Sequence, residues 1–115
     1  MITTRQAQAR VRVSFNGEVI ADSTDALVLE EGDYPPVYYL PRKDVKMERL
    51  IRTSHTTYCP HKGQATYYSI SNGGQTARNA VWSYETPIEP VAAIRELLAF
   101  YPDRVSIEIG DTAAD

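Results

Sequence analysis

Apolar and polar residues alternate with a period of two along several short segments, which is the pattern of half-buried β-strands. Residues 10–15 (Arg-Val-Arg-Val-Ser-Phe) alternate in this way, and the Asn16-Gly17 pair that follows is a strong signal for a tight hairpin turn. We therefore expect residues 18–21 to return as the partner strand. Further strand-like segments, bounded by glycine, proline or asparagine, lie at 26–30, 37–40, 64–70, 77–84 and 105–109. Asn72-Gly73-Gly74 predicts the turn that joins 64–70 to 77–84.

A single segment has helical spacing. Its apolar residues recur three or four positions apart, at Val91, Ile94, Leu97 and Leu98. Pro90 suits a first helical position and Pro102 ends the segment, so one short helix is expected near residues 90–100. Residues 42–53 fit neither period, and for them we expect a turn at 42–44 followed by a strand. The sequence thus predicts a mainly β fold, a single antiparallel β domain with one short helix in its C-terminal half.

Length and composition fit one domain. The chain has 115 residues, 43% of them hydrophobic and 23% charged, which is typical of a soluble globular protein. We expect the domain to span residues 10–110, between flexible tails at 1–9 and 111–115. No apolar run approaches the roughly 20 residues that cross a bilayer, and the polar start lacks the apolar segment of a signal peptide. A cytoplasmic protein without a membrane partner is expected.

The net charge of −3 conceals a segregation of signs. Residues 17–33 hold six carboxylates and no Lys or Arg, whereas residues 42–62 hold Arg42, Lys43, Lys46, Arg49, Arg52 and Lys62 against two carboxylates. One interpretation is a local positive field that attracts a phosphate or carboxylate. The other is that the two blocks pair across adjacent strands. The acidic total argues against a nucleic-acid partner.

Reactive groups are densest at residues 57–63, Thr-Tyr-Cys-Pro-His-Lys-Gly, which hold the only cysteine. Cys59 would act as a nucleophile if exposed beside a base such as His61 or His55, so Cys59 and His61 are weak catalytic candidates. No second cysteine is present to resolve a disulfide. The same residues also suit a tight turn in which Cys59 packs as a small apolar group. His55, Cys59 and His61 are acceptable metal ligands, but a closed zinc site needs four and the sequence has no further Cys or His, so no metal is expected. No cofactor is expected either.

Ligand binding is the other interpretation of this region. Lys62, Arg42 and the backbone amides of a turn at Gly63 would bind an anion. Eight tyrosines exceed what a small core needs, and on alternating strands about half of them face away from the core or into a cleft. Tyr58, Tyr39 and Trp82 are therefore candidate walls for a planar ligand. Ordinary strand formation or a dimer interface would use the same tyrosines.

Several ordered motifs resemble one known family. They are residues 10–13 (Arg-Val-Arg-Val), 19–23 (Val-Ile-Ala-Asp-Ser), 38–45 (Tyr-Tyr-Leu-Pro-Arg followed by Asp-Val), 57–63 and 80–87 (Ala-Val-Trp-Ser-Tyr-Glu-Thr-Pro). Over roughly residues 10–110 the chain is similar to the bacterial and fungal domain-of-unknown-function family numbered 427. The resemblance implies a β-tent domain, similar in outline to methionine sulfoxide reductase B and the cereblon ligand-binding domain. Such folds often hold zinc with four cysteines, so with one cysteine no zinc site is expected here.

The resemblance also carries a nucleotidyltransferase-like label for its activity. The sequence has no Gly-Ser followed by the paired aspartates that metal-dependent nucleotidyl transfer uses, and Asp22 and Asp25 are the nearest pair. The leading hypothesis is therefore a module that binds a small anionic or planar ligand, possibly nucleotide-like in shape and charge. A thiol-dependent or nucleotidyltransferase-like enzyme and a homodimeric interaction domain are the alternatives.

Overall fold

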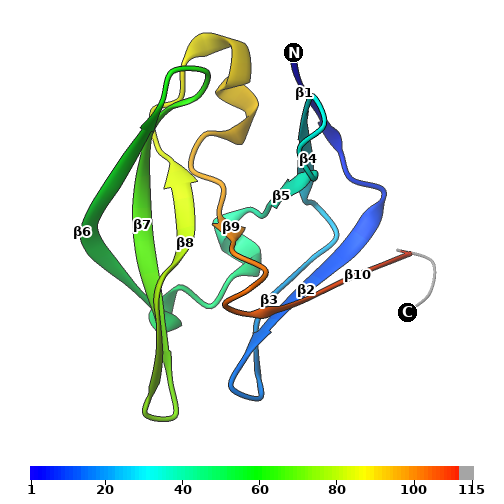
Figure 1. Ribbon diagram of the computed structural model, residues 1–115. Coiled ribbons are helices and arrows are strands. Elements are labelled where there is room, and N and C mark those ends of the chain that lie inside the picture. Colours follow the sequence, from blue (N-terminus) through cyan, green and yellow to red (C-terminus); the bar gives the residue numbers. More distant parts are fainter. Residues whose placement is uncertain (112–115) are drawn as a thin grey trace.

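Ten strands form three antiparallel sheets in the computed structural model, which describes residues 1–111 (Figure 1). The first sheet has the order β1 (Ile2–Gln6), β4 (Leu27–Glu31), β5 (Val37–Tyr39). The second has the order β10 (Ser106–Asp111), β2 (Ala9–Phe15), β3 (Glu18–Ser23). The third has the order β6 (Leu50–Cys59), β7 (Gly63–Asn72), β8 (Gln75–Tyr84), β9 (Ala99–Phe100). The 3-10 helices η1 (Arg42–Asp44), η2 (Met47–Arg49) and η3 (Glu89–Ile94) lie between strands.

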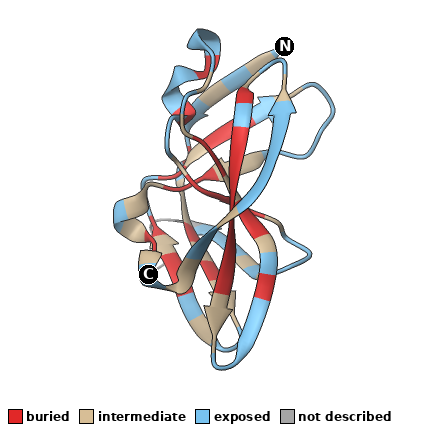
Figure 2. Cartoon of the chain, turned by 90° about the vertical axis from the view of Figure 1, so that its left-hand side faces the viewer, coloured by how far each residue is buried: buried red, intermediate tan, exposed pale blue. Residues whose placement is uncertain are grey.

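The predicted mainly β, antiparallel fold is confirmed, and so are its two tight hairpins. Asn16 and Gly17 both have positive φ (50° and 83°), as a type I′ turn between β2 and β3 requires. Gly73 and Gly74 have φ values of 58° and 80° in the turn between β7 and β8. Burial does not alternate along the two neighbouring strands β6 and β7. Most residues of β7 are buried, whereas β6 is largely exposed (Figure 2).

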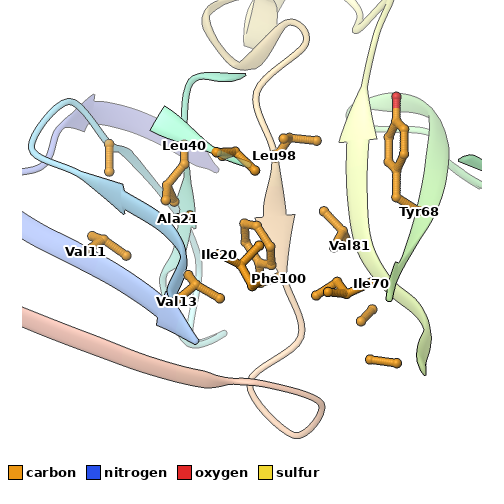
Figure 3. Packing of buried hydrophobic residues seen from close by; sticks show 14 of the residues in the cluster. Val11, Val13, Ile20, Ala21, Leu40, Tyr68, Ile70, Val81, Leu98 and Phe100 are labelled. Atoms are coloured by element: carbon orange, nitrogen blue, oxygen red, sulfur yellow. The ribbon is translucent and has the colours of Figure 1, made fainter. Parts of the chain in front are cut away.

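The larger of two hydrophobic clusters lies between the second and third sheets. Figure 3 shows Phe100 of β9 between apolar residues of β2 and β3, such as Val13, and those of β7 and β8, such as Val81. Leu40 and Leu98 connect the layers, because each N–H donates to the other's carbonyl at 2.8 Å. Burying large apolar side chains on both faces of this contact is the main stabilising term for such a fold.

The smaller cluster packs η3 and the end of β8 against β4 and β5. It contains Tyr39, Tyr67, Tyr84, Val91 and Ile94, together with the partly buried Trp82 and Tyr101. Tyrosine is thus a core-forming residue at this end of the molecule. Buried phenol hydroxyls need hydrogen-bond partners, so this cluster brings polar groups into the core.

The N-terminal residues differ from the expectation of a flexible tail at 1–9. Strand β1 pairs with β4 over Ile2↔Glu31 to Gln6↔Leu27, and the Ala7 N–H donates to the Ala26 carbonyl at 2.9 Å. The tail prediction was wrong here because β4 would otherwise present an open edge, which β1 satisfies. Of the tail expected at 111–115, Asp111 ends β10, and residues 112–115 lie outside the described residues.

The expected helix at 90–100 is shorter and of another type. Only Glu89–Ile94 is helical, in 3-10 form and interrupted at Val91, and β9 follows at Ala99. Glu96 leaves the helical path with a φ of 63°, and its N–H donates to the Tyr84 carbonyl at 2.9 Å. Tertiary contacts therefore override the helical spacing. No helix within residues 1–111 is long and apolar enough to cross a membrane.

Residues 42–53 were expected to form a turn and then a strand. The turn is the 3-10 helix η1, and a second 3-10 helix, η2, delays the strand until Leu50. From there β6 runs on to Cys59, so residues 57–59 belong to a strand rather than to a tight turn. The turn itself is closed by the Lys62 N–H, which donates to the Cys59 carbonyl at 3.0 Å.

Candidate functional site

A groove of about 890 Å³ opens where the three sheets meet. We call it the apolar groove. Val11, Val13, Ile107 and Ile109 line it from β2 and β10, and Val37, Tyr38, Leu40, Trp82 and Phe100 line it from the other two sheets. Its remaining lining residues are Glu31, Tyr34, Pro35, Pro36, Cys59, His61 and Pro102. Its volume lies in the range of roughly 300–1,000 Å³ that small-molecule sites occupy.

A smaller cavity of about 190 Å³ adjoins the groove, and we call it the tyrosine chamber. It is lined by Leu29, Tyr39, Lys62, Tyr67, Tyr84 and Tyr101, together with five residues that it shares with the groove. The shared residues are Glu31, Tyr34, Pro35, Val37 and Trp82. A ligand that stacks on Trp82 therefore reaches both spaces at once.

Hydrogen bonds and ring contacts hold the aromatic side chains of the chamber in place. The Trp82 Nε1–H donates to the Tyr39 hydroxyl at 3.3 Å, and the two rings meet edge to face. The Tyr67 hydroxyl lies 3.2 Å from that of Tyr101 and 3.0 Å from Thr57 Oγ1. The Trp82 and Tyr101 rings lie 4.5 Å apart. Such mutual contacts give a preformed wall rather than freely rotating rings.

Tyr84 is the exception in this network. Its side chain lines the chamber and the residue is 7% exposed, yet its hydroxyl makes no hydrogen bond to any residue within 1–111. Burial raises the pKa of Tyr84 to about 12, and burial also raises the pKa of Tyr39 and of Tyr101 above the usual value. These hydroxyls therefore remain protonated at neutral pH and are available as donors.

Lys62 is the cation of the chamber, and it is paired. Its ammonium lies 3.0 Å from Glu31 Oε1 and 3.7 Å from Cys59 Sγ, and its side chain is only 13% exposed. Because Glu31 neutralises the charge of Lys62, the site as a whole carries little net field. Cys59 and His61 line the groove beside it.

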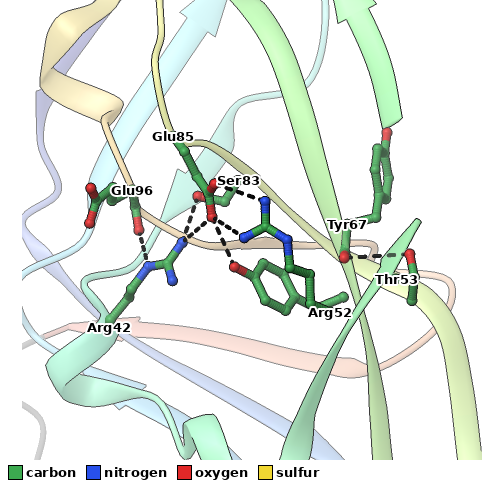
Figure 4. Close-up of polar contacts among 8 residues, drawn as sticks. Arg42, Arg52, Thr53, Tyr67, Ser83, Glu85 and Glu96 are labelled. Atoms are coloured by element: carbon green, nitrogen blue, oxygen red, sulfur yellow. Dashed lines mark hydrogen bonds and ion pairs between the residues drawn. The ribbon is translucent and has the colours of Figure 1, made fainter. Parts of the chain in front are cut away.

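The structure places Arg42 in a different cluster, shown in Figure 4. Its Nε–H donates to the Glu96 carbonyl at 2.7 Å, and its Nη2 lies 3.4 Å from Glu85 Oε2. Glu85 also accepts from Arg52, at 3.1 and 3.2 Å, and from the Tyr68 hydroxyl at 3.0 Å. Arg42 lines neither the groove nor the chamber, so the structure does not bring it together with Lys62.

Three further sequence candidates also lie outside both spaces. Tyr58 is 73% exposed on β6. Gly63 has a φ of 118°, and a Cβ added there would lie 3.4 Å from the Thr86 carbonyl oxygen, so the geometry of the turn accounts for a glycine at this position. His55 is exposed and contacts the Tyr67 ring with centroids 4.5 Å apart. Tyr39, Trp82, Lys62, Cys59 and His61 are the candidates that converge on the site.

The segregated charges pair with each other, but not across adjacent strands as that interpretation expected, because Lys43, Lys46 and Arg49 lie in or beside η1 and η2 and Lys62 lies in the turn after β6. Four basic residues of 42–62 contact carboxylates of the acidic block, through Lys43–Asp25, Lys46–Glu18, Arg49–Glu18 and Lys62–Glu31. The other two, Arg42 and Arg52, pair with Glu85. Each cation of this segment therefore has a carboxylate partner.

The carboxylates considered for nucleotidyl transfer are engaged elsewhere. Asp22 lies 2.8 Å from Arg10 and 3.4 Å from Arg12, and Asp25 lies 2.7 Å from Lys43. Within residues 1–111, the His, Cys, Asp and Glu side chains form no group of three or more that would hold a metal ion.

Sequence reasoning did not single out Glu31, Tyr84, Tyr101 or the walls from β2 and β10. Tyr84 carries no local signal beyond ending an alternating strand, and Glu31 reads as one carboxylate of an acidic run. Ile107 and Ile109 were expected to alternate in a strand, but the pattern does not say that they face a groove. These positions become a site only through the packing of separate sheets.

Comparison with protein families gives one match. The model of a family described as a domain of unknown function, DUF427, covers residues 3–111, which is nearly the whole chain. Comparison with curated proteins finds no match for this sequence.

Proposed function

This chain belongs to the DUF427 family of domains of unknown function, and we propose that it is a binding module for a planar, largely apolar small molecule. The observation that carries the proposal is the continuity of the apolar groove with the tyrosine chamber through Trp82. Ligand sites typically combine apolar and aromatic walls with a few polar groups that fix orientation. The groove supplies the walls, and the chamber supplies the polar groups.

The charges favour a planar ligand over an anion. Among the described residues, Lys62 is the only Lys or Arg that lines either space, and Glu31 lies 3.0 Å from it. A phosphate in the chamber would have to compete with Glu31 for the same ammonium. A nucleotide-like ligand would therefore gain from stacking its base on Trp82 and little from its phosphates.

Trp82 offers a direct test, because it is the only tryptophan and lines both spaces. Native mass spectrometry of the purified protein would show a copurified compound. Trp82 fluorescence and thermal-shift measurements would detect the binding of compounds from a panel of planar aromatic molecules. A compound that binds should raise the melting temperature and change the emission together.

Val37 and Val19 give a matched pair of variants for this test. Val37 lines both spaces, so Val37→Phe should fill the junction and abolish both responses. Val19 is exposed on β3 and lines neither space, so Val19→Phe should bind like the wild type. Binding that survives Val37→Phe, or a panel without any binder, would contradict the proposal.

A thiol-dependent enzyme is the second candidate, and one observation favours it. Cys59 lines the groove, and the Lys62 ammonium lies 3.7 Å from its Sγ, where positive charge stabilises a thiolate. Glu31 opposes this effect by pairing with Lys62 at 3.0 Å. The rate at which Cys59 is alkylated in the folded protein distinguishes the thiol-dependent enzyme from the binding module.

A homodimer is a third candidate, favoured by β6. This strand forms one edge of its sheet and exposes Ile51 and Tyr58. Exposed edges pair readily with other strands, although the irregular register between Arg52 and Thr56 interrupts this one. Analytical ultracentrifugation of the wild type and of Ile51→Glu tests it, since a dimer through β6 should dissociate in the variant.

A further inference from the structure

The tyrosine chamber holds hydrogen-bond donors that have no acceptor partner within residues 1–111. The Tyr84 hydroxyl has no partner within residues 1–111. The Tyr39 hydroxyl accepts from Trp82 at 3.3 Å, which leaves its own proton free to donate. Lys62 has three N–H groups, of which Glu31 and Cys59 engage two. Tyr84, Tyr39 and Lys62 all line the chamber.

We infer that the tyrosine chamber takes the carbonyl oxygen of a planar ligand, with Tyr84 as its principal hydrogen-bond donor. The inference rests on the proposed function and specifies its ligand. A carbonyl oxygen has two lone pairs and accepts from two donors at once. In this arrangement the ring that bears the carbonyl stacks on Trp82, and the apolar remainder of the ligand lies in the groove.

The charges of the chamber select a neutral acceptor. The Lys62–Glu31 pair leaves no net positive charge to offset the desolvation of a carboxylate. The same pair leaves no net negative charge to offset the desolvation of a cationic head. A purely apolar head would leave the Tyr84 hydroxyl buried and unpaired, which costs free energy that a carbonyl recovers.

The volume of the chamber supports a head group rather than a whole ligand. Its 190 Å³ is below the usual size of a ligand site, whereas the adjoining groove has 890 Å³. Polar donors are thus confined to the small space and apolar walls to the large one. This division matches a molecule with one polar end.

Four naphthalenes substituted at the same ring carbon test the inference by calorimetry: naphthamide, ethylnaphthalene, naphthoate and naphthylmethylammonium. They share the ring and differ in the head. Tyr84→Phe removes the hydroxyl alone and breaks no hydrogen bond within residues 1–111. Tyr58→Phe is the matched control, because Tyr58 is exposed and lines neither space.

We expect naphthamide to bind tightest, and Tyr84→Phe to weaken naphthamide roughly fivefold while leaving ethylnaphthalene unchanged. Tyr58→Phe should change neither. If every naphthalene binds equally and Tyr84→Phe has no effect, the carbonyl inference is overturned while the binding function stands. Tightest binding of naphthoate overturns it in favour of an anionic head. If none of the four binds, both the inference and the proposed function are contradicted.

Discussion

Lys62 and Glu31 join two sheets, because the ammonium in the turn after β6 lies 3.0 Å from the carboxylate at the end of β4. The pair lines the tyrosine chamber on one side of the junction, and no Lys or Arg within residues 1–111 lines the groove. Its partial burial distinguishes it from the surface ion pairs of the same chain, whose contributions are screened by water.

The first prediction is that Lys62→Met destabilises the protein by about 2 kcal/mol, because it leaves Glu31 partly buried without its partner. The double variant Lys62→Met with Glu31→Gln should recover about 1 kcal/mol of that loss, since no unpaired charge remains. Urea denaturation of the wild type, both single variants and the double variant measures the coupling.

Arg5 and Glu30 provide the control for this cycle. They pair at 3.6 Å on neighbouring strands, with side chains 58% and 48% exposed. The same substitutions there, Arg5→Met and Glu30→Gln, should show a coupling below about 0.5 kcal/mol. Equal coupling energies in the two cycles would mean that Lys62–Glu31 behaves as an ordinary surface pair.

The second prediction concerns pH and the cluster around Glu85. Burial acts to raise the pKa of Glu85, but hydrogen bonds from Arg52 and Tyr68 and the charge of Arg42 outweigh it and hold the pKa below its usual value. A carboxyl with a lowered folded-state pKa contributes stability above its unfolded-state pKa and loses it as pH falls through the folded one. Glu85→Gln should therefore be less stable than the wild type at neutral pH, by on the order of 1 kcal/mol.

The gap between Glu85→Gln and the wild type should narrow as the pH falls below 4.5, the usual pKa of a glutamate, and close only at the lower pH at which the folded wild type takes up its proton. Urea denaturation at a series of pH values measures it. Comparing the two proteins removes the contributions of Glu18 and Asp22, whose pKa values are also lowered, by Arg49 and Arg10 respectively. A gap that is constant or widens at low pH would contradict the assignment.

The local elements were predictable where one short-range rule decides them. Asn16-Gly17 and Gly73-Gly74 require positive φ, and both form the expected hairpins. The helix expected at 90–100 does not extend over that range. The same apolar spacing also fits a chain that turns at Glu96 and runs extended through Leu98. Spacing reports which residues are buried. It does not report which partner buries them.

The site was predictable only in part, for a related reason. Trp82, Tyr39 and Lys62 were found from residue type and position, and they do meet in the chamber. Arg42 was predicted to share a site with Lys62 because both belong to one basic segment. Its ion pair with Glu85 instead places it outside the groove and the chamber. Ile107 and Glu31 are far apart in the sequence and belong to different sheets, yet both line the groove. Only the packing of the sheets brings them together.

The third prediction tests the backbone at Gly63. Its φ of 118° is rare for any residue with a Cβ, and an added Cβ would lie 3.4 Å from the Thr86 carbonyl oxygen. Gly63→Ala should therefore cost about 1–3 kcal/mol in unfolding free energy. Gly110→Ala is the control, because nothing lies within 4 Å of its added Cβ, and it should stay within about 0.5 kcal/mol of the wild type. Equal stabilities would show that the turn relaxes around alanine.

The fourth prediction is that Cys59 is not a catalytic nucleophile. Its side chain is half-buried in the wall of the groove, and the neighbouring ammonium of Lys62 is shared with Glu31. Because Cys59 is the only cysteine, iodoacetamide labelling reports on this side chain alone. Labelling of the folded protein should be roughly tenfold slower than that of the urea-unfolded chain at mildly alkaline pH, since burial limits access.

Two comparisons make the labelling of Cys59 decisive. A naphthalene that occupies the groove should slow it further in the wild type and have no effect in Val37→Phe, where the junction is filled. Lys62→Met should change the rate little. Fast labelling of the folded protein at mildly acidic pH, lost in Lys62→Met, would instead reveal a thiolate stabilised by that ammonium. The thiol-dependent enzyme would then replace the binding module as the better account of this groove.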